Sequence, residues 1–569
     1  MDRNLILAIV LSIAIIVGFQ LLFQVYSPPP AKPPAQKEAP TGPPAPQPTV
    51  SREELREEEP SGQPPVDKLP IPVSRQPEEA APAKELHVTV ETPEYRAVLS
   101  SVGAKIVSFK LKNYREALDS PNLVNLFPPG GADTSGPSII FTRRDERFND
   151  SDLRYQYDGE SADIRLDQRG AKKSITFRVS VAGLIISKTY TFMEGTYKVG
   201  FDYALTNTTD EARNYLITFP WKKAFSTEPD TRFAWNSVEI LLNSELKDYS
   251  IDKIQGDEEP SGRVEWAGLG NVYFFKALVF GDTPATKVTL FKPTKEGVTE
   301  IKVRYGAVDV APGQTTKKAL ALYLGPKQRD ALRDAGYGLS GALIYSNYKL
   351  LDVMAEYLMK FLRFSHSGFT LFGIKVPGTH NFGWDIILLT IVIKILFIPL
   401  THKSMKSMKK MQELQPQLQK FREKYKDNKE ELNKATMQLF REYKVSPLSG
   451  CWPMFVQLPV FIALYQALSY AIELRHAAFI CIPSIYLCLN DLSAPDPYYV
   501  TPILMGGTMV LQQWMTPSGG DPTQKKLMLL MPVVFTYLFL TFPSGLVLYW
   551  LVSNLLQIGQ QLLTNKFWS

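Results

Sequence analysis

Lys394 places a cationic side chain inside the apolar stretch DIILLTIVIKILFIPLT, which runs from Asp385 to Thr401. A charge near the centre of a membrane span costs on the order of 3 kcal/mol on insertion scales, so such residues usually mark functional sites. Lys394 lies about 9 Å from Leu400, the end of the apolar run, at a helical rise of about 1.5 Å per residue. Two interpretations stay open here: the ammonium snorkels to the nearby interface, or it lies in a polar cavity inside a helix bundle.

Side-chain amides in the other apolar runs bear on this choice. Amides within a membrane are costly unless they face water, one another or a neighbouring helix. Thr390 lies four residues before Lys394 and therefore on the same helical face. These groups are compatible with a shared polar cavity and also with plain interhelical hydrogen bonds. The amides are those of Gln457, Gln466, Gln512, Gln513, Asn554 and Gln557.

The sequence contains no motif of nucleotide hydrolysis or zinc catalysis. Neither GxxxxGK[ST] nor HExxH occurs, and the five histidines are scattered along the chain. The three cysteines form no metal cluster, and for Cys481 and Cys488 we expect apolar packing, with a strained disulfide as the alternative. We therefore expect a protein that is not an enzyme and that uses no metal or cofactor.

Six apolar runs organise the membrane part, at roughly 20 residues per bilayer crossing. The first, Leu5–Val25, is interpreted as an uncleaved anchor because no small-residue cleavage site follows it. Several of the other five runs are shorter than this length. The last two are separated only by Pro543 and Ser544, which predicts a tight hairpin. These five are Gly383–Leu400, Cys451–Leu474, Tyr498–Met515, Leu527–Phe542 and Gly545–Leu563.

Charge between the runs predicts the topology. The segment His402–Pro447 carries twelve Lys and Arg against six Asp and Glu, whereas the loop before Tyr498 keeps Asp491 and Asp496 and little basic charge. Because cytoplasmic loops are enriched in Lys and Arg, we expect six spans with both termini in the cytoplasm.

Three further segments precede the membrane core. Residues 27–84 are rich in Pro, Glu, Ala and Gln, which predicts a disordered linker after the anchor at 1–26. Residues 85–330 alternate apolar and polar side chains in many short strands, which predicts an antiparallel β-sandwich outside the cytoplasm, with a hairpin turn near Glu194 and Gly195. Residues 331–380 contain an amphipathic helix that we expect on the membrane surface, with packing against the β-domain as the alternative.

A helical hairpin is predicted at 403–446 within the basic segment. Apolar residues recur there at three- and four-residue intervals, and Asn428 with Glu431 is typical of a capping box. The basic charge is explained equally well by topology alone, by anionic lipid headgroups or by ribosomal RNA. The candidate contact residues are Lys406, Lys409, Lys410, Lys420 and Arg422. Altogether the sequence predicts a multi-domain α+β membrane protein: a six-span α-helical bundle, a large extracytoplasmic β-sandwich and this hairpin.

Three long motifs in the core resemble the YidC/Oxa/Alb family of membrane protein insertases. They are KVSPLSGCWPMFVQLPVFIALYQAL, DPYYVTPILMGGTMVLQQ and MPVVFTYLFLTFPSGLVLYWLVSN, within a resemblance that covers about 381–566. The single preceding span and the large β-domain are similar to the Gram-negative YidC type. The resemblance implies a five-helix insertase core at 381–569 in the bacterial inner membrane, with the β-domain in the periplasm.

The same resemblance implies how such a core works. Nascent membrane proteins would enter a hydrophilic groove open to cytoplasm and lipid, alone or beside the Sec translocon. Ribosomes, the signal-recognition-particle receptor and anionic lipids are implied partners, and no small-molecule substrate is implied. The matching groove residues would be Lys394, Thr390, Gln457, Gln512, Gln513, Trp550 and Asn554.

This chain departs from the family pattern at two points. Gram-negative members usually carry arginine where Lys394 stands, and a buried lysine loses its proton more easily than an arginine does. The tail after the last run is short, whereas relatives with long basic tails use them to contact ribosomes. A secondary transporter or channel with an extracytoplasmic domain is the alternative function, since polar residues around a cavity also suit transport.

Overall fold

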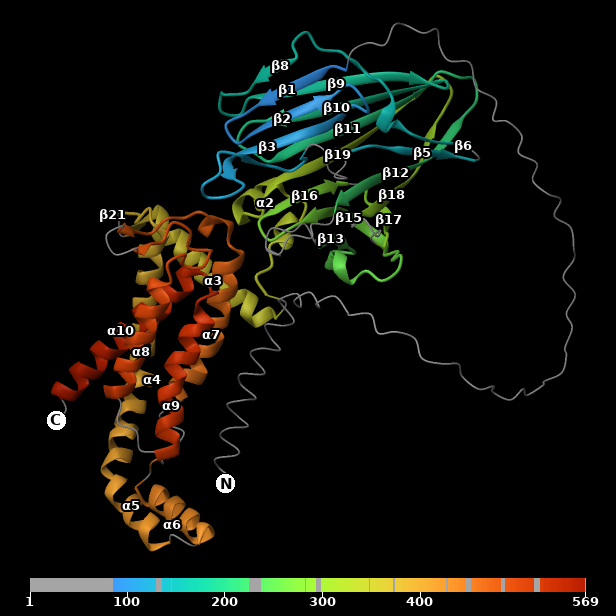
Figure 1. Ribbon diagram of the computed structural model, residues 1–569. Helices are drawn as coiled ribbons and strands as arrows, with labels where there is room; N and C mark the ends of the chain where they lie inside the picture. The colour runs from blue at the N-terminus through green and yellow to red at the C-terminus, as the bar shows by residue number, and fades with distance from the viewer. Residues whose placement is uncertain are drawn as a thin grey trace, which may run out of the picture. The chain divides into compact units, whose positions relative to one another are not determined.

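The computed structural model describes most of the chain from Glu85 onward (Figure 1). The described residues are 85–128, 136–144, 146–224, 237–281, 283–292, 298–346, 348–371, 374–425, 428–443, 445, 452–482, 487–515 and 522–567. The anchor predicted at 1–26 and the linker predicted at 27–84 lie outside these residues.

The β-domain is built from two sheets, as the alternating sequence predicts. The smaller sheet has the strand order β4-β3-β2-β1-β8, in which only the β1–β8 pair is parallel. Its strands are β1 (His87–Glu91), β2 (Tyr95–Ser100), β3 (Lys105–Arg115), β4 (Leu123–Asn125) and β8 (Asp163–Arg165).

The larger sheet has 14 strands, and its pairs are antiparallel. The order is β6-β5-β12-β18-β17-β15-β16-β19-β11-β10-β9-β7, with β13 joining β14 to β15. The strands are β5 (Ile140–Arg143), β6 (Glu146–Asn149), β7 (Gln156–Tyr157), β9 (Lys172–Val181), β10 (Leu184–Met193), β11 (Lys198–Asn207), β12 (Arg213–Ala224), β13 (Ser237–Leu242), β14 (Glu245–Ser250), β15 (Ser261–Gly270), β16 (Phe274–Val279), β17 (Ala285–Leu290), β18 (Val298–Val310) and β19 (Thr315–Pro326).

The two sheets pack face to face over a core that the side-chain alternation creates. Every second residue of β10 is buried, because successive side chains of a strand point to opposite faces. Across the core the ring of Tyr95 on β2 lies 6.3 Å from that of Phe192 on β10. The predicted hairpin turn between β10 and β11 is confirmed, and Gly195 adopts a φ of +78° there, which suits glycine.

A short helical segment follows the β-domain. It comprises α2 (Arg329–Ala335), α3 (Lys349–Ser367) and the small β20–β21 hairpin (Gly368–Leu371 and Ile374–Pro377). On α3, Ala355, Met359 and Leu362 are buried and the helix packs against α7 (Trp452–Tyr470), whereas Leu350 is 70% exposed. The predicted apolar face is therefore only partly covered by protein, and its contact with the membrane stays a prediction.

The helical core contains α4 (Phe382–Glu413), α7, α8 (Val500–Met515), α9 (Pro522–Phe539) and α10 (Ser544–Phe567). Helix α10 lies beside α4, α7 and α8, and α9 lies beside α8 (Figure 1). Among the described residues, α4 and the part Ser544–Leu563 of α10 are long and apolar enough to cross a membrane, while α7 and α9 contain shorter apolar stretches. The predicted number of six spans is therefore not established by helix length.

Helix α4 is longer than its apolar run. It begins after Asn381, whose side chain accepts hydrogen bonds from the backbone N–H groups of Gly383 and Trp384, and it continues beyond Leu400 to Glu413. The buried Asp385 accepts a hydrogen bond of 2.7 Å from Thr379 and lies 3.0 Å from His366 Nδ1 of α3. These contacts fix the start of α4 against the end of α3.

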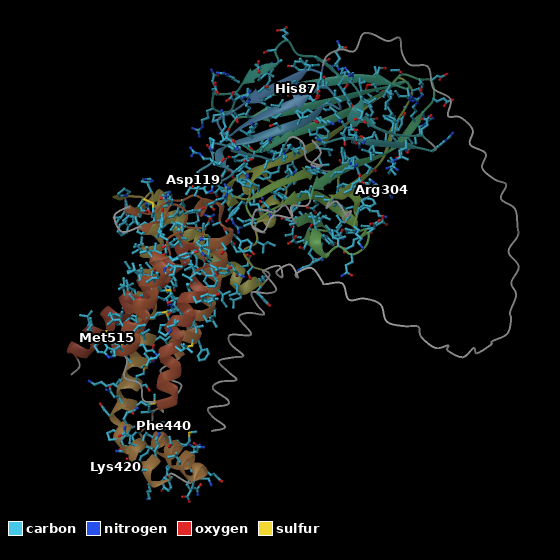
Figure 2. The ribbon with its side chains drawn as sticks, viewed as in Figure 1. His87, Asp119, Arg304, Lys420, Phe440 and Met515 are labelled. Carbon is cyan, nitrogen blue, oxygen red and sulfur yellow. A yellow bond between two sulfur atoms is a disulfide. The ribbon has the colours of Figure 1, made fainter. Side chains whose placement is uncertain are left out.

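The basic segment forms the predicted hairpin from α5 (Gln415–Lys424) and α6 (Lys429–Glu442). Asn428 caps α6, since its side chain accepts a 3.2 Å hydrogen bond from Glu431 N–H. A small apolar cluster of Leu414, Leu418, Leu439 and Val445 joins the two helices. Figure 2 labels Lys420 and Phe440 in this hairpin.

The expectation of apolar packing for the cysteines is wrong. Cys481 and Cys488 form a disulfide across the two-stranded hairpin of β22 (Cys481–Ile482) and β23 (Leu487–Cys488), in the loop between α7 and α8. The strands place the two residues opposite each other, with their Cα atoms 3.9 Å apart. Their spacing in the sequence is therefore that of a short β-hairpin rather than of one helical face.

Candidate functional site

Lys394 contacts another helix through its charged end. Its Nζ donates a 3.1 Å hydrogen bond to Oε1 of Gln557 on α10, and its side chain is half-buried. Within the described part of the chain, Gln557 is its one hydrogen-bond acceptor and no carboxylate pairs with it. Thr390, one turn earlier, is fully buried and donates to the backbone oxygen of Ile386 in its own helix at 2.7 Å. Thr390 and Lys394 lie one turn apart on α4, and the hydrogen-bond partner of Lys394 is Gln557 rather than Thr390.

Helix α10 carries a polar stripe that bonds to three neighbouring helices. Its members are Ser553, Asn554, Gln557, Gln560 and Gln561, which recur at helical spacing. Asn554 Nδ2 donates to Thr508 Oγ1 on α8 at 3.3 Å, and Gln560 Nε2 donates to Thr401 Oγ1 on α4 at 3.0 Å. Gln561 Nε2 donates to the backbone oxygen of Met515 on α8 at 2.9 Å.

Gln457 of α7 completes these contacts. Its Nε2 lies 3.3 Å from the hydroxyl oxygen of Tyr549 and 3.4 Å from Ser553 Oγ, both on α10. Lys394 of α4 and Gln457 of α7 thus each bond to α10, and Asn554 of α10 bonds to α8. Polar groups that satisfy one another in this way stabilise helix contacts inside a bilayer by about 1 kcal/mol each.

The remaining predicted amides are more dispersed. Gln512 and Gln513 are half-buried on α8, and among the described residues neither is hydrogen-bonded to Lys394. Gln466 on α7 is 5% exposed, and its Oε1 is buried with no hydrogen-bond partner among the described residues. None of these three amides is therefore joined to Lys394 by a hydrogen bond among the described residues, and the place of Gln512 and Gln513 in the groove stays a prediction.

Trp550 belongs to an aromatic cluster between three helices. Its ring lies 4.9 Å from Phe461 of α7, 5.2 Å from Phe539 and 6.0 Å from Phe535 of α9. This cluster packs α7 and α9 against α10, one turn before Asn554. The role predicted for Trp550 in contacting substrate stays a prediction.

Sequence reasoning missed the partner residues of the site. The bonds described above also involve Tyr549, Ser553, Gln560, Thr508 and Thr401. Four of these side chains carry a hydroxyl group, and a single hydroxyl changes the pattern of an apolar run very little. The stripe on α10 was the available signal, because polar residues at three- and four-residue intervals mark one face of a helix.

The five basic candidates lie on two helices. Lys406, Lys409 and Lys410 belong to the end of α4, and Lys420 and Arg422 belong to α5. All five are exposed, so each charge is accessible to a ligand or to solvent.

Comparison with known proteins identifies the family. A family model described as the 60Kd inner membrane protein matches residues 374–569, and one described as the YidC periplasmic domain matches residues 87–360. The membrane protein insertase YidC of Geobacter metallireducens is 37% identical over 509 residues, which cover 88% of this chain and 89% of that protein. This chain belongs to the YidC family of membrane protein insertases.

A second relative agrees with that assignment. The YidC insertase of Syntrophus aciditrophicus is 38% identical over 505 residues, covering 85% of each chain. A crystal structure of an active YidC insertase with its first transmembrane domain resolved is 18% identical and covers 84% of this chain and 94% of that one, with a TM-score of 0.36. The resemblance seen in the core motifs is confirmed, and the YidC-family protein is an inner membrane protein with a periplasmic β-rich domain.

Proposed function

We propose that this YidC-family insertase integrates nascent membrane proteins through a polar groove whose cationic group is Lys394. The observation that carries the proposal is the contact of the ammonium with the neutral amide of Gln557 and with no carboxylate of the described residues. A cation held this way keeps its attraction for an acidic group that enters from outside. Thr390, Gln457, Gln512, Gln513, Trp550 and Asn554 are proposed to line the same groove.

The groove lowers the cost of moving a polar segment across the membrane. A nascent hydrophobic helix approaches from the cytoplasm, and its short polar flank meets water, amides and Lys394 instead of hydrocarbon. The apolar part then enters lipid along α7 and α9. The sequence has no nucleotide-binding motif, so hydrophobic transfer, aided by the membrane potential, drives the step.

Two features at opposite ends of α4 support the proposed orientation. Its N-terminal end lies near the loop that holds the disulfide, since Asn381 Nδ2 donates to the backbone oxygen of Phe479 at 3.1 Å. Disulfides persist in oxidising compartments such as the periplasm, whereas exposed basic residues favour the cytoplasm. Both support a cytoplasmic hairpin, with both chain termini cytoplasmic.

The proposed partners rest on the family resemblance and on the exposed basic residues. The basic hairpin would contact ribosomes or anionic lipids, and the insertase would act alone or with the Sec translocon and the signal-recognition-particle receptor. The family match favours this insertion role over solute transport by a secondary transporter or channel.

Reconstitution in liposomes tests the proposal with client proteins that differ only in the charge of their translocated flank. Lys394→Arg should retain insertion because the charge is kept. Lys394→Ala should impair acidic-flank clients most, and Lys394→Glu should impair them further because attraction becomes repulsion. Equal losses for acidic and neutral flanks, or full activity of Lys394→Ala, would reject the electrostatic role.

A further inference from the structure

The acceptor of the Lys394 hydrogen bond is itself a candidate for function. Gln557 lies on α10, the helix that faces α4, and its Oε1 is 3.1 Å from the lysine Nζ. An ammonium group has three N–H donors and no acceptor, and Gln557 accepts from one of these donors. The contact orders the lysine without cancelling its charge.

The surrounding contacts show that the α4–α10 seam does not depend on this bond alone. Gln560, one turn further along α10, donates to Thr401 of α4 at 3.0 Å. Thr401 is seven residues beyond Lys394, or about 10 Å along the helix. The two glutamines therefore offer a matched pair on one helix, of which only Gln557 contacts the cation.

We propose that Gln557 is a positioning residue for Lys394. Its neutral amide oxygen binds the ammonium at the place that a substrate carboxylate takes when it enters the groove. The inference rests on the proposed groove and adds a specificity determinant to it. A carboxylate binds an ammonium more strongly than a neutral amide does, because the attraction between opposite charges adds to the hydrogen bond. An acidic flank entering the groove displaces the Gln557 oxygen, whereas a neutral flank leaves the Lys394–Gln557 bond in place.

The sharpest variant is Gln557→Glu, because it keeps the shape of the side chain and supplies a resident carboxylate. Neutralising Lys394 in this way should lower insertion of acidic-flank clients by roughly tenfold, the equivalent of about 1.4 kcal/mol. Neutral-flank clients should change by no more than about twofold, a difference of roughly 0.4 kcal/mol. Gln560→Glu is the control, since it adds the same charge to the same helix beside Thr401.

A charge exchange supplies an independent readout. Lys394→Gln alone should lose acidic-flank insertion, and Lys394→Gln combined with Gln557→Lys should regain most of it, because the cation returns to the same place from the other helix. Insertase amounts and insertion of the neutral-flank client, measured in the same vesicles, report whether each variant is folded.

The outcomes separate this inference from the proposed function. If Lys394→Gln leaves acidic-flank insertion intact, the cationic groove itself is wrong. If Lys394→Gln is impaired while Gln557→Glu behaves like Gln560→Glu, or lowers both clients equally, the groove stands and Gln557 is only a helix-packing residue. Failure of the exchange variant to recover acidic-flank insertion, in a protein that still inserts the neutral client, also overturns the role of Gln557.

Discussion

Lys188 and Asp150 form an ion pair of 2.6 Å in the β-sandwich, and both side chains are 0% exposed. Lys188 also donates to the backbone oxygens of Gly103 and Pro137, while Asp150 accepts from the Tyr155 hydroxyl and the Ile139 N–H. Burial lowers the pKa of Lys188, an effect that Asp150 opposes. Breaking a satisfied buried pair leaves one charge without compensation, which destabilises far more than losing a surface pair.

Asp150→Asn should therefore lower the free energy of unfolding of the β-domain by about 3–5 kcal/mol at pH 7. The variant lowers the Lys188 pKa further below that of the unfolded chain, so between those two pKa values the unfolded chain binds more protons. Stability then rises with pH, and the loss should shrink by up to about 1.4 kcal/mol per pH unit between the Lys188 pKa of the variant and that of the unfolded chain, about 10.4. Hydrogen exchange of β10 amides in the full-length protein measures this change.

The control is Asp158→Asn, which breaks the exposed ion pair of Asp158 with Arg178, whose side chain is 61% exposed. That substitution should cost less than about 1 kcal/mol. Losses of similar size in the two variants, or no recovery with pH for Asp150→Asn, would contradict the account.

At the scale of elements, α4 joins the proposed groove to the basic hairpin. It runs without interruption from Phe382 to Glu413, so Lys394 and Lys406 lie on the same helix. The hairpin has a small apolar core. Its buried side chains are those of Leu414, Leu418, Leu439 and Val445, and the apolar residues packed against them are only partly buried. Most of its surface is therefore available for binding rather than used for folding.

Replacing Lys406, Lys409, Lys410, Lys420 and Arg422 by glutamine should weaken binding of ribosomes or of vesicles rich in anionic lipid. Binding of the unchanged protein should also decrease with salt, because exposed charges are screened over about 8–10 Å at 0.1–0.15 M ionic strength. Cosedimentation at several salt concentrations measures both effects. Salt-independent binding that survives the replacements would mean that these charges serve only as a topology signal.

At the scale of the whole molecule, the β-domain and the helical core each have their own buried side chains. The hydrogen bonds described above for the proposed groove join residues between Ile386 and Gln561, and none of them involves residues 85–325. The separate family matches at 87–360 and 374–569 follow the same division.

Deleting Glu85–Gly325 while keeping the spans should therefore leave substantial insertion activity. The reason is that the groove contacts and the flank chemistry remain intact in the shortened chain. Insertion into liposomes, compared at equal amounts of correctly oriented protein, measures the effect. A stable deletion variant without any activity would show that the β-domain takes part in insertion directly.

Several features were predictable from the sequence because they depend on the pattern of residues within a short segment. Alternation predicted the strands and the Gly195 turn, the spacing of apolar residues predicted the α5–α6 hairpin, and Asn428 and Glu431 predicted its cap. Long core motifs resembled the insertase family, and the relatives confirm that membership. Each of these signals is contained within a few dozen consecutive residues.

Other features were decided only by the tertiary structure. Helical spacing placed Thr390 and Lys394 on one face but could not say that Gln557, more than 160 positions later, would meet the lysine. It likewise left open the aromatic cluster of Trp550, the pair of Lys188 with Asp150, and the disulfide of Cys481 with Cys488, where we expected apolar packing. The physical reason is that periodicity fixes which side chains share a face, whereas the rotation of each helix and the pairing of each strand are set by packing against elements distant in the chain.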